Sequence, residues 1–379
     1  MIRVVHVDEI PQYRVSFYEG IRSQLAKHGV QYDLVTGQPN REIAAKEDVV
    51  SLGWERRVAN RHYQIGKVNL VWHPVLHEIR NCDLAIVGQE NGRIVNYVAQ
   101  ILGPIRRSKL AFFGHGKNFQ ADSDKAPAER WKRFWATKCD WWFTYTNKTR
   151  ELIESYGFPP DRITVFHNAV DTSELRRWDN EIKEDELGTL RRQLDIDTDK
   201  VAVYVGGLYD IKRLGFLIEA AKEVRRCIPD FVLIVIGAGV DQPLVEAAAA
   251  VHPWIRYLGP RFGREKAALM RLSKAFLMPG AVGLAILDCS ALGTPIVTTG
   301  YPFHGPEISY LESGENGLMV EDWRNVAAYA NAVVSLLCND VLQAKLATGA
   351  RAMAQSYTIE NMVDCFCAGV LSCLATKKR

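Results

Sequence analysis

Short apolar runs recur along the first half of the chain and alternate with longer segments of helical periodicity. The runs cover residues 2–7, 32–35, 83–87, 109–113 and 141–145. Between them, amphipathic stretches such as the one with Phe17, Ile21 and Leu25 place apolar groups four residues apart on one helix face. Near-continuous apolar runs are what parallel strands covered on both faces require. This half therefore predicts a doubly wound α/β sheet.

A second alternating series follows a strongly charged stretch without strand signal. Its expected strands are 201–205, 231–236, 254–258, 275–278 and 295–298, and its expected helices include 214–226, 241–250 and 264–272. The tail 325–374 is expected to be helical. We therefore predict two Rossmann-like domains that face each other across a cleft. The expected parts are an N-terminal domain at 1–170, a connector with some helix at 171–200, a C-terminal domain at 201–355, and a final helix at 356–379. Whether this final helix packs back on the N-terminal domain is left open.

Composition narrows the class of protein. The chain has 379 residues, of which 47% are hydrophobic and 24% charged, values of an ordinary globular protein of about two domains. The net charge of +3 is too small to indicate nucleic-acid binding. Residues 1–170 carry 24 lysines and arginines against 18 acidic residues. That basic half favours an anionic acceptor or an anionic membrane surface, although scattered solvated charge explains it equally well.

The eight cysteines form no CxxC pair, a pattern that suits free thiols in a reducing compartment. The first residues lack the features of a signal peptide. No apolar stretch reaches the roughly 18 residues that span a bilayer. We expect a cytoplasmic protein and leave a peripheral contact with the inner face of a membrane open.

The first candidate site follows the expected strand 201–205. Two glycines, Gly206 and Gly207, come directly after the strand, and Lys212 lies just before the next helix. Glycines permit close approach of a ligand to the backbone, and a lysine at this place can neutralise a diphosphate. A plain strand, turn and helix with a surface lysine explains the segment equally well.

The second candidate site follows the expected strand 275–278. The glycine-rich turn contains Gly280, Val282 and Gly283, and a helix is expected to begin near Gly283. Backbone N–H groups at that helix start suit a phosphate. Asp288 lies inside the helix between apolar residues, where an unpaired carboxylate is costly. We expect it to accept hydrogen bonds from two ribose hydroxyls, with a polar face residue as the simpler alternative.

Taken together, the segments resemble the retaining glycosyltransferases of family 4 over nearly the whole chain. The matching features are the strand, glycine and lysine pattern ending at Lys212, the Gly-Leu-x-x-Leu-acidic pattern from Gly283, the Pro306-Glu307 element, and the segment 163–171. The resemblance implies that Lys212 contacts the donor diphosphate and that Asp288 is the second acidic residue of a Glu-x7-Glu motif and binds ribose. Gly283 and Leu284 are implied to present backbone to the diphosphate and ribose.

Two positions depart from the family pattern. The first glutamate of the motif falls at Gly280, and the arginine that usually precedes the lysine falls at Gly207. By resemblance, that glutamate touches the transferred sugar and that arginine supports the diphosphate. Arg213 is a substitute cation or an ordinary helix-surface residue.

Further candidates follow strands of the first domain. His115 lies between two glycines after the strand 109–113, which is expected to leave its imidazole exposed in the cleft. The resemblance places a histidine here against the donor sugar and the acceptor. Tyr13 and Arg14, in the loop after the first strand, are expected to bind an anionic or sugar acceptor, as are Glu90 and Asn118.

The basic segment with Trp131 and Trp135 is either a membrane-facing helix or a helix whose tryptophans face the core. The Asp-x-Asp stretches lie in the connector and in a polar loop rather than at a donor-domain strand end, so we expect catalysis without a metal or cofactor. We interpret the chain as a retaining glycosyltransferase that acts on a nucleotide-diphosphate sugar and on a glycan, a lipid-linked molecule or a small hydroxyl compound, in bacterial polysaccharide synthesis by resemblance. The alternatives are a nucleotide-sugar epimerase and a non-catalytic binding subunit.

Overall fold

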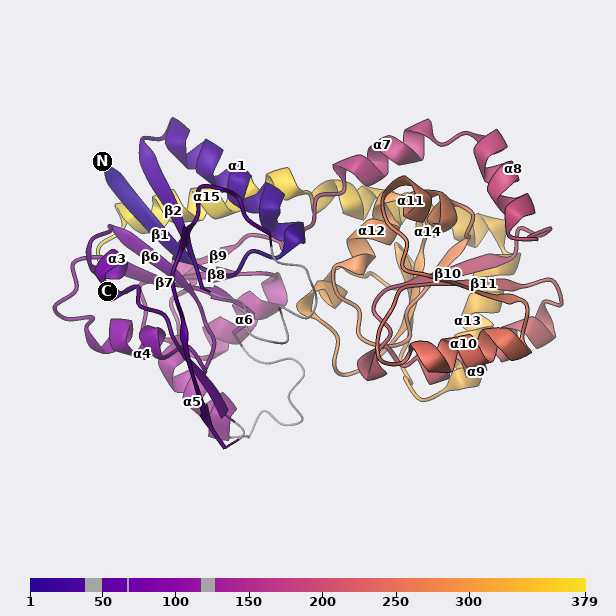
Figure 1. Cartoon of the computed structure of the whole chain (residues 1–379), viewed down its shortest axis with the longest axis horizontal. Coiled ribbons are helices and arrows are strands. Elements are labelled where there is room, and N and C mark those ends of the chain that lie inside the picture. Colours follow the sequence, from indigo (N-terminus) through magenta and orange to yellow (C-terminus); the bar gives the residue numbers. More distant parts are fainter. Residues whose placement is uncertain (38–49, 67, 117–126) are drawn as a thin grey trace. The chain divides into compact units, whose positions relative to one another are not determined.

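The structure is a computed structural model of the chain, and it describes residues 1–37, 50–66, 68–116 and 127–379. The chain folds into two compact units (Figure 1). The first unit comprises Met1–Val170 and Ile359–Arg379, and the second comprises Asp171–Thr358. Each unit has a parallel β-sheet with helices packed on it.

The first unit contains a seven-stranded sheet of order β3-β2-β1-β6-β7-β8-β9, in which every pairing is parallel. Its strands are β1 (Ile2–Val7), β2 (Val30–Thr36), β3 (Arg56–Arg57), β6 (Leu84–Gly88), β7 (Lys109–Gly114), β8 (Trp141–Thr144) and β9 (Ile163–Val165). The strands β4 (Arg61–Ile65) and β5 (Val68–Trp72) form a separate antiparallel pair. The helices are η1 (Gln12–Arg14), α1 (Val15–Lys27), α3 (Leu76–Arg80), α4 (Ile94–Ile101), α5 (Pro127–Ala136), α6 (Asn147–Ser155), η2 (Pro160–Arg162) and α15 (Ile359–Ala375).

The two faces of this sheet are covered by different sets of apolar side chains. On one face, Val5, Val87 and Trp142 belong to a fully buried cluster that includes residues of α3, α4 and α6. On the other face, α1 and α15 lie side by side (Figure 1). Phe366 of α15 stacks on Phe143 with ring centroids 4.4 Å apart. Burial on both faces explains why the strands read as continuous apolar runs.

The second unit contains a six-stranded parallel sheet of order β12-β11-β10-β13-β14-β15. Its strands are β10 (Val201–Val205), β11 (Val232–Ile236), β12 (Ile255–Gly259), β13 (Ala275–Leu277), β14 (Ile296–Thr299) and β15 (Gly317–Val320). Its helices are α7 (Ser173–Glu181), α8 (Glu184–Gln193), η3 (Asp210–Lys212), α9 (Leu214–Cys227), α10 (Gln242–Val251), α11 (Gly263–Arg271), α12 (Ala285–Ala291), η4 (Pro306–Tyr310), α13 (Val326–Cys338) and α14 (Asp340–Ser356). The charged segment 171–200 thus contains α7 and α8, which pack against α11.

One stretch, Asp340–Ala375, is long and apolar enough to cross a membrane by length and composition, which the sequence interpretation did not anticipate. It consists of α14 and α15, and 44% of its most apolar window is buried in the protein. Met362, Phe366 and Val370 of α15 are fully buried. The apolar face of this helix is therefore used for packing within the first unit.

Candidate active site

The two glycine-bearing segments of the second unit meet at the carboxyl ends of β10 and β13. The Lys212 ammonium donates a hydrogen bond to the Ala281 carbonyl oxygen and lies 4.0 Å from the Met278 sulfur. Among the described residues, no carboxylate lies within ion-pair distance of it. Burial lowers the pKa of the Lys212 ammonium to about 8. A partly buried cation without an anionic partner is electrostatically unfavourable until an anion binds beside it.

Gly280 allows this meeting of the two segments. A Cβ atom at position 280 would lie 2.3 Å from the Ile211 carbonyl oxygen and 2.5 Å from the Lys212 carbonyl carbon. Both obstacles are backbone atoms, which cannot move aside as a flexible side chain can. The same Ile211 oxygen accepts a hydrogen bond from the Ala281 N–H at 2.8 Å. A glutamate at position 280 therefore does not fit this arrangement, which gives a physical reason for the departure from the family motif.

The turn 278–284 is also held from the side of β14. The Val282 N–H donates to Nδ1 of His304 at 3.0 Å, and Nε2 of the same ring lies 2.7 Å from the Thr299 carbonyl oxygen. One neutral tautomer, with the proton on Nε2, satisfies both contacts. His304 is 8% exposed. The sequence interpretation missed this residue, because a single histidine in a loop carries no pattern that reveals its partner.

Asp288 lies in the first turn of α12, which begins at Ala285. Its Oδ2 atom is 3.0 Å from Nζ of Lys266 on α11, and both side chains are partly exposed. The carboxylate therefore has a partner, but a partly exposed ion pair contributes little to stability and leaves further lone pairs for ribose hydroxyls. The sequence did not reveal Lys266.

The glycines after β10 lie beside two tyrosines. The Tyr204 hydroxyl donates to the Gly207 carbonyl oxygen at 2.7 Å. A Cβ at Gly207 would lie 2.2 Å from the Tyr209 ring, so this ring occupies the space that a side chain at 207 would need. Arg213 has a left-handed backbone with φ of 57°. Its guanidinium donates to the Pro279 carbonyl oxygen at 3.3 Å and lies over three aromatic rings, so it is not an ordinary helix-surface residue.

His115 follows β7 in the first unit, between Gly114 and Gly116, which both have positive φ. The imidazole is half-buried rather than exposed, because its ring packs 4.2 Å from the Tyr145 ring. Burial, and then the charges of Lys132 and Arg14, lower the pKa of His115 to about 3. The imidazole is therefore neutral near pH 7 and can donate or accept a hydrogen bond without charge.

Arg14 is near this histidine and is 4% exposed. Its guanidinium lies over the rings of Tyr13, Phe17 and Tyr145 and donates weakly to the Met362 sulfur at 3.8 Å. In the part of the chain that the structure describes, it forms no ion pair with a carboxylate. Tyr145, at the end of β8, was not predicted, although its place after an apolar run was the available signal.

The other predicted acceptor residues have contacts of their own. Glu90 is exposed and pairs with Arg93 at 2.8 Å, and Arg93 also lies 3.7 Å from Asp8. This buried arginine, which the sequence analysis did not single out, thus connects the carboxyl ends of β1 and β6. Tyr13 is 44% exposed. Asn118 lies outside the described residues.

Within the described residues, no group of three or more His, Cys, Asp and Glu side chains is arranged to hold a metal ion. The connector aspartates have other partners, since Asp199 pairs with Lys274 at 2.5 Å and Asp195 lies 3.4 Å from Arg256. Of the two tryptophans of α5, Trp131 is 50% exposed and Trp135 is partly buried, so Trp131 does not lie in the core. All eight cysteines are free thiols.

Comparison with known proteins indicates the family of this chain. Residues 18–174 match the family model described as Glycosyltransferase Family 4, and residues 199–339 match the model described as Glycosyl transferases group 1. The two models together cover most of the chain, one in each unit. The chain belongs to glycosyltransferase family 4. The predicted family is confirmed, whereas the variant motif with Gly280 stays a prediction.

Individual family members are distant from this chain. A D-inositol 3-phosphate glycosyltransferase of Salinispora arenicola is 28% identical over 230 residues, which are 56% of this chain and 50% of that protein. A phosphatidyl-myo-inositol mannosyltransferase of Mycobacterium leprae is 33% identical over 154 residues, 39% of this chain and 40% of that protein. The chain thus spans about half the length of the curated relatives it matches.

The fold is shared over the full length. The structure of Anabaena Alr3699/HepE in complex with UDP covers 98% of this chain and 100% of its own, with a TM-score of 0.72 and 15% identity. The predicted fold class, two doubly wound parallel sheets of the GT-B kind, is confirmed.

Proposed function

We propose that the chain transfers a glycosyl group from a nucleotide-diphosphate sugar to a hydroxyl acceptor, with retention of anomeric configuration and without a metal. The observation that carries this proposal is the partly buried Lys212 ammonium, which contacts the turn 278–284 and pairs with no carboxylate among the described residues. A diphosphate is the anion that a glycosyltransferase must stabilise, because it departs with the electron pair of the broken anomeric C–O bond.

The donor would bind along the carboxyl ends of β10 and β13. We assign Lys212 to the diphosphate, Asp288 to the ribose hydroxyls, and the backbone of Gly206, Gly207, Gly280, Val282, Gly283 and Leu284 to close contact with both. Lys212 is close enough to the turn to neutralise charge that develops on a phosphate oxygen there. Preorganised charge of this kind acts more strongly in a site from which water is excluded.

His115 is assigned to the transferred sugar and the acceptor. A neutral imidazole suits a hydrogen bond to a sugar hydroxyl, and the pKa of about 3 keeps it neutral throughout the ordinary pH range. Tyr13, Arg14, Glu90 and Asn118 are assigned to the acceptor. The names of the inositol-phosphate relatives are consistent with an acceptor that carries both hydroxyls and an anionic group, which Arg14 suits by its charge.

The proposed acceptor is a glycan, a lipid-linked molecule or a small hydroxyl compound. We propose that the reaction belongs to polysaccharide synthesis and takes place in the cytoplasm. Support for a reducing compartment comes from the eight free thiols. A nucleic-acid substrate is not proposed, since the net charge is only +3.

The test is incubation of the protein with a panel of nucleotide-diphosphate sugars, with and without candidate acceptors and with and without a chelator. We expect one donor to raise the melting temperature most and to be consumed only when an acceptor is present. NMR of the product would report its anomeric configuration. An isomerised donor formed without acceptor, or binding without any turnover across the panel, would contradict the proposal.

A further inference from the structure

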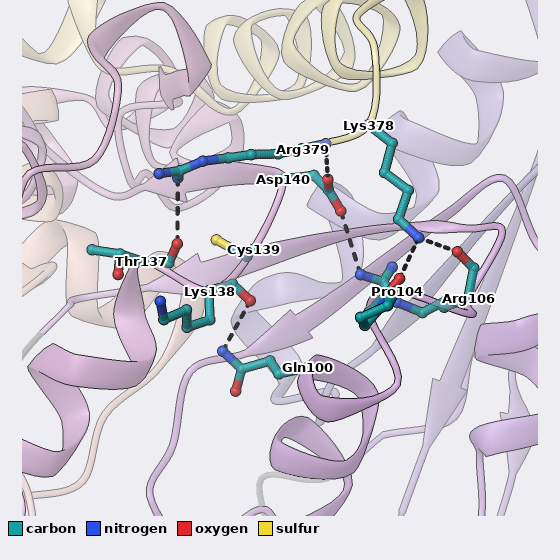
Figure 2. Close-up of a pocket in the computed structure, with 10 residues that line it drawn as sticks. Gln100, Pro104, Arg106, Thr137, Lys138, Cys139, Asp140, Lys378 and Arg379 are labelled. Atoms are coloured by element: carbon teal, nitrogen blue, oxygen red, sulfur yellow. Dashed lines mark hydrogen bonds and ion pairs between the residues drawn. The ribbon is translucent and has the colours of Figure 1, made fainter.

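A cavity of about 320 Å³ opens at the amino-terminal edge of the first unit's sheet (Figure 2). It is lined by Gln100 of α4, by the segment 103–106 that leads into β7, by the segment 137–140 before β8, and by Lys378 and Arg379. The candidate acceptor residues instead follow strand ends at the opposite edge of this sheet, since His115 comes after β7 and Glu90 after β6. This cavity is therefore separate from the acceptor site proposed above.

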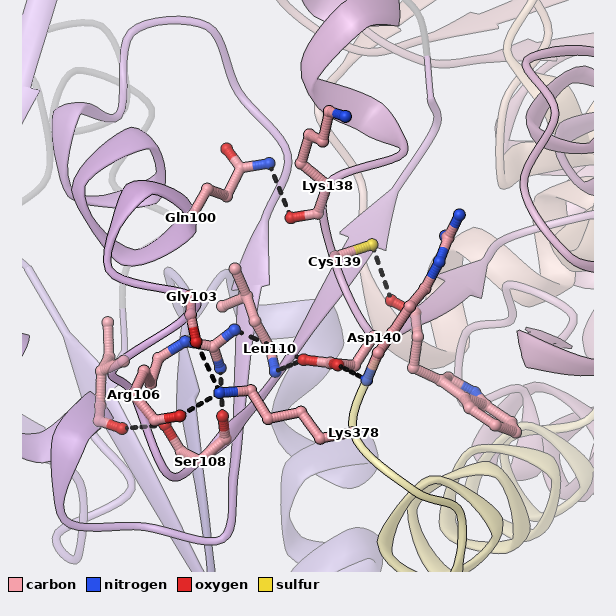
Figure 3. A network of polar contacts seen from close by, with 12 residues as sticks. Gln100, Gly103, Arg106, Ser108, Leu110, Lys138, Cys139, Asp140 and Lys378 are labelled. Carbon is pink, nitrogen blue, oxygen red and sulfur yellow. Dashed lines mark hydrogen bonds and ion pairs between the residues drawn. The ribbon is translucent and has the colours of Figure 1, made fainter.

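Positive side chains dominate the lining. Four of its ten residues are cations, namely Arg106, Lys138, Lys378 and Arg379, and Asp140 is the single carboxylate side chain among them. Both oxygens of Asp140 are already occupied (Figure 3). Oδ2 accepts from the Leu110 N–H at 2.8 Å and lies 3.4 Å from Arg106, and Oδ1 accepts from the Arg379 N–H at 2.6 Å. Asp140 pairs with Arg106 alone, so the side-chain charges of Lys138, Lys378 and Arg379 have no carboxylate side chain as a partner among the described residues.

Two cations of this lining, Arg106 and Lys378, are not fully satisfied. Arg106 is 7% exposed, and its Nε atom has no hydrogen-bond partner among the described residues. The Lys378 ammonium donates to the carbonyl oxygens of Gly103 and Arg106, which do not balance its charge. Burial, and then the charge of Arg106, lower the pKa of Lys378. The positive charges of Arg106 and Lys378 thus repel each other, and a bound anion would relieve that repulsion.

We propose that this cavity is a binding site for a phosphate ester, distinct from the donor and acceptor sites. A doubly charged phosphate group matches the excess of cations, and arginine and lysine are the side chains that bind phosphate oxygens most readily. The volume exceeds that of a phosphate group alone, so the cavity has room for an organic part of the ligand as well.

The surroundings of the opening indicate what that organic part is. Ile101 ends α4 beside the lining residue Gln100, and Ile105 precedes Arg106. Their side chains are 66% and 79% exposed, which is costly for isoleucine in water. The nearby Lys138 ammonium lies 5.6 Å from the exposed Phe134 ring. Apolar side chains next to a phosphate site favour a phospholipid headgroup over a free phosphate ester.

The experiment uses two double variants of the full chain with the same change in net charge. Lys138→Gln with Arg379→Gln removes two exposed cations of the lining, and neither residue pairs with a carboxylate among the described residues. Arg107→Gln with Lys377→Gln removes two exposed cations from the same segments, outside the lining. Lys138→Gln alone guards against a folding defect in the first double variant.

The probes are inorganic phosphate and glycerol phosphate by thermal shift at constant ionic strength, and sedimentation with phosphatidylcholine vesicles with and without phosphatidylglycerol. We expect the lining variant to bind on the order of tenfold more weakly than the wild type. The control variant should bind as the wild type does, and Lys138→Gln should show a smaller loss. Binding of the soluble probes supports a soluble source, and binding only to phosphatidylglycerol vesicles supports the lipid. No binding of any probe, or equal losses in both double variants, overturns the proposal.

Discussion

Replacing Gly280 with alanine tests whether this glycine joins the two donor-side segments. A Cβ at this position would lie 2.3 Å from the Ile211 carbonyl oxygen, whereas ordinary contact begins near 3.4 Å. The turn would therefore have to move by roughly 1 Å. Such a shift breaks the hydrogen bond from Ala281 to the same oxygen.

The two effects give the expected magnitude. Overpacking costs about 1–3 kcal/mol, and the lost hydrogen bond adds about 0.5–1.5 kcal/mol. We expect the free energy of unfolding of the second unit to fall by about 2–4 kcal/mol. With a urea dependence of about 2 kcal/mol per molar, the transition midpoint should fall by about 1–2 M. Nucleotide binding should weaken as well, because the displaced turn leaves Lys212.

Gly283→Ala is the matched control in the same turn. Its backbone does not have positive φ, and no atom of the described residues lies within 4 Å of the Cβ it would gain. The assay is a urea titration of both variants followed by circular dichroism. Equal midpoints for the two variants would refute the close approach of the turn to residues 211–212.

The remaining predictions concern charged and titratable groups. If the imidazole contacts the reacting sugar, His115→Ala should lower kcat by about 10²–10³-fold. The pKa of His115 is about 3, so the pH–rate profile of the wild type should show no inflection near pH 6.5 from this group. Unchanged turnover in the variant would show that His115 is not part of the site. Asp288→Asn should weaken nucleotide binding about tenfold or more, whereas Lys266→Gln should change nucleotide binding little. A larger loss of affinity in Lys266→Gln than in Asp288→Asn would make Asp288 a purely structural partner of Lys266. Because the pKa of Lys212 is about 8 in the folded chain and 10.5 in an exposed lysine, the unfolded chain holds the extra proton between these values, so stability should rise from pH 8 to 10.5. Lys212→Met should lack that rise in a pH series of denaturation midpoints, and an identical rise in both proteins would contradict the assigned burial.

Local pattern was sufficient to predict much of the fold. The expected strand 201–205 coincides with β10, and the expected helix 241–250 is displaced by one residue from α10. Five or more buried apolar residues in a row are a strong signal when helices cover both faces of a sheet. β3, with two exposed residues, and the exposed β4 were missed, since neither has buried side chains to produce such a pattern.

The candidate site was predicted less completely, because its contacts join residues far apart in the sequence. Lys212 and the turn 278–284 were selected separately, and only the structure gives the hydrogen bond to Ala281. The sequence identified Gly280 as a departure from the family motif. The structure gives the reason, because a side chain at position 280 would collide with the backbone of residues 211–212. Tyr145 packs against His115, and His304 accepts a hydrogen bond from the Val282 N–H. These partners are distant in the sequence, so no local pattern predicts the contacts.

Hydrogen–deuterium exchange with and without a nucleotide-diphosphate sugar tests the central claim most directly. If the diphosphate binds beside Lys212, backbone amides in 206–213 and in 278–287 should exchange more slowly with the donor bound, and the Lys212→Met variant should lose both effects together. Protection confined to other segments, or protection of these two that survives in Lys212→Met, would contradict the account.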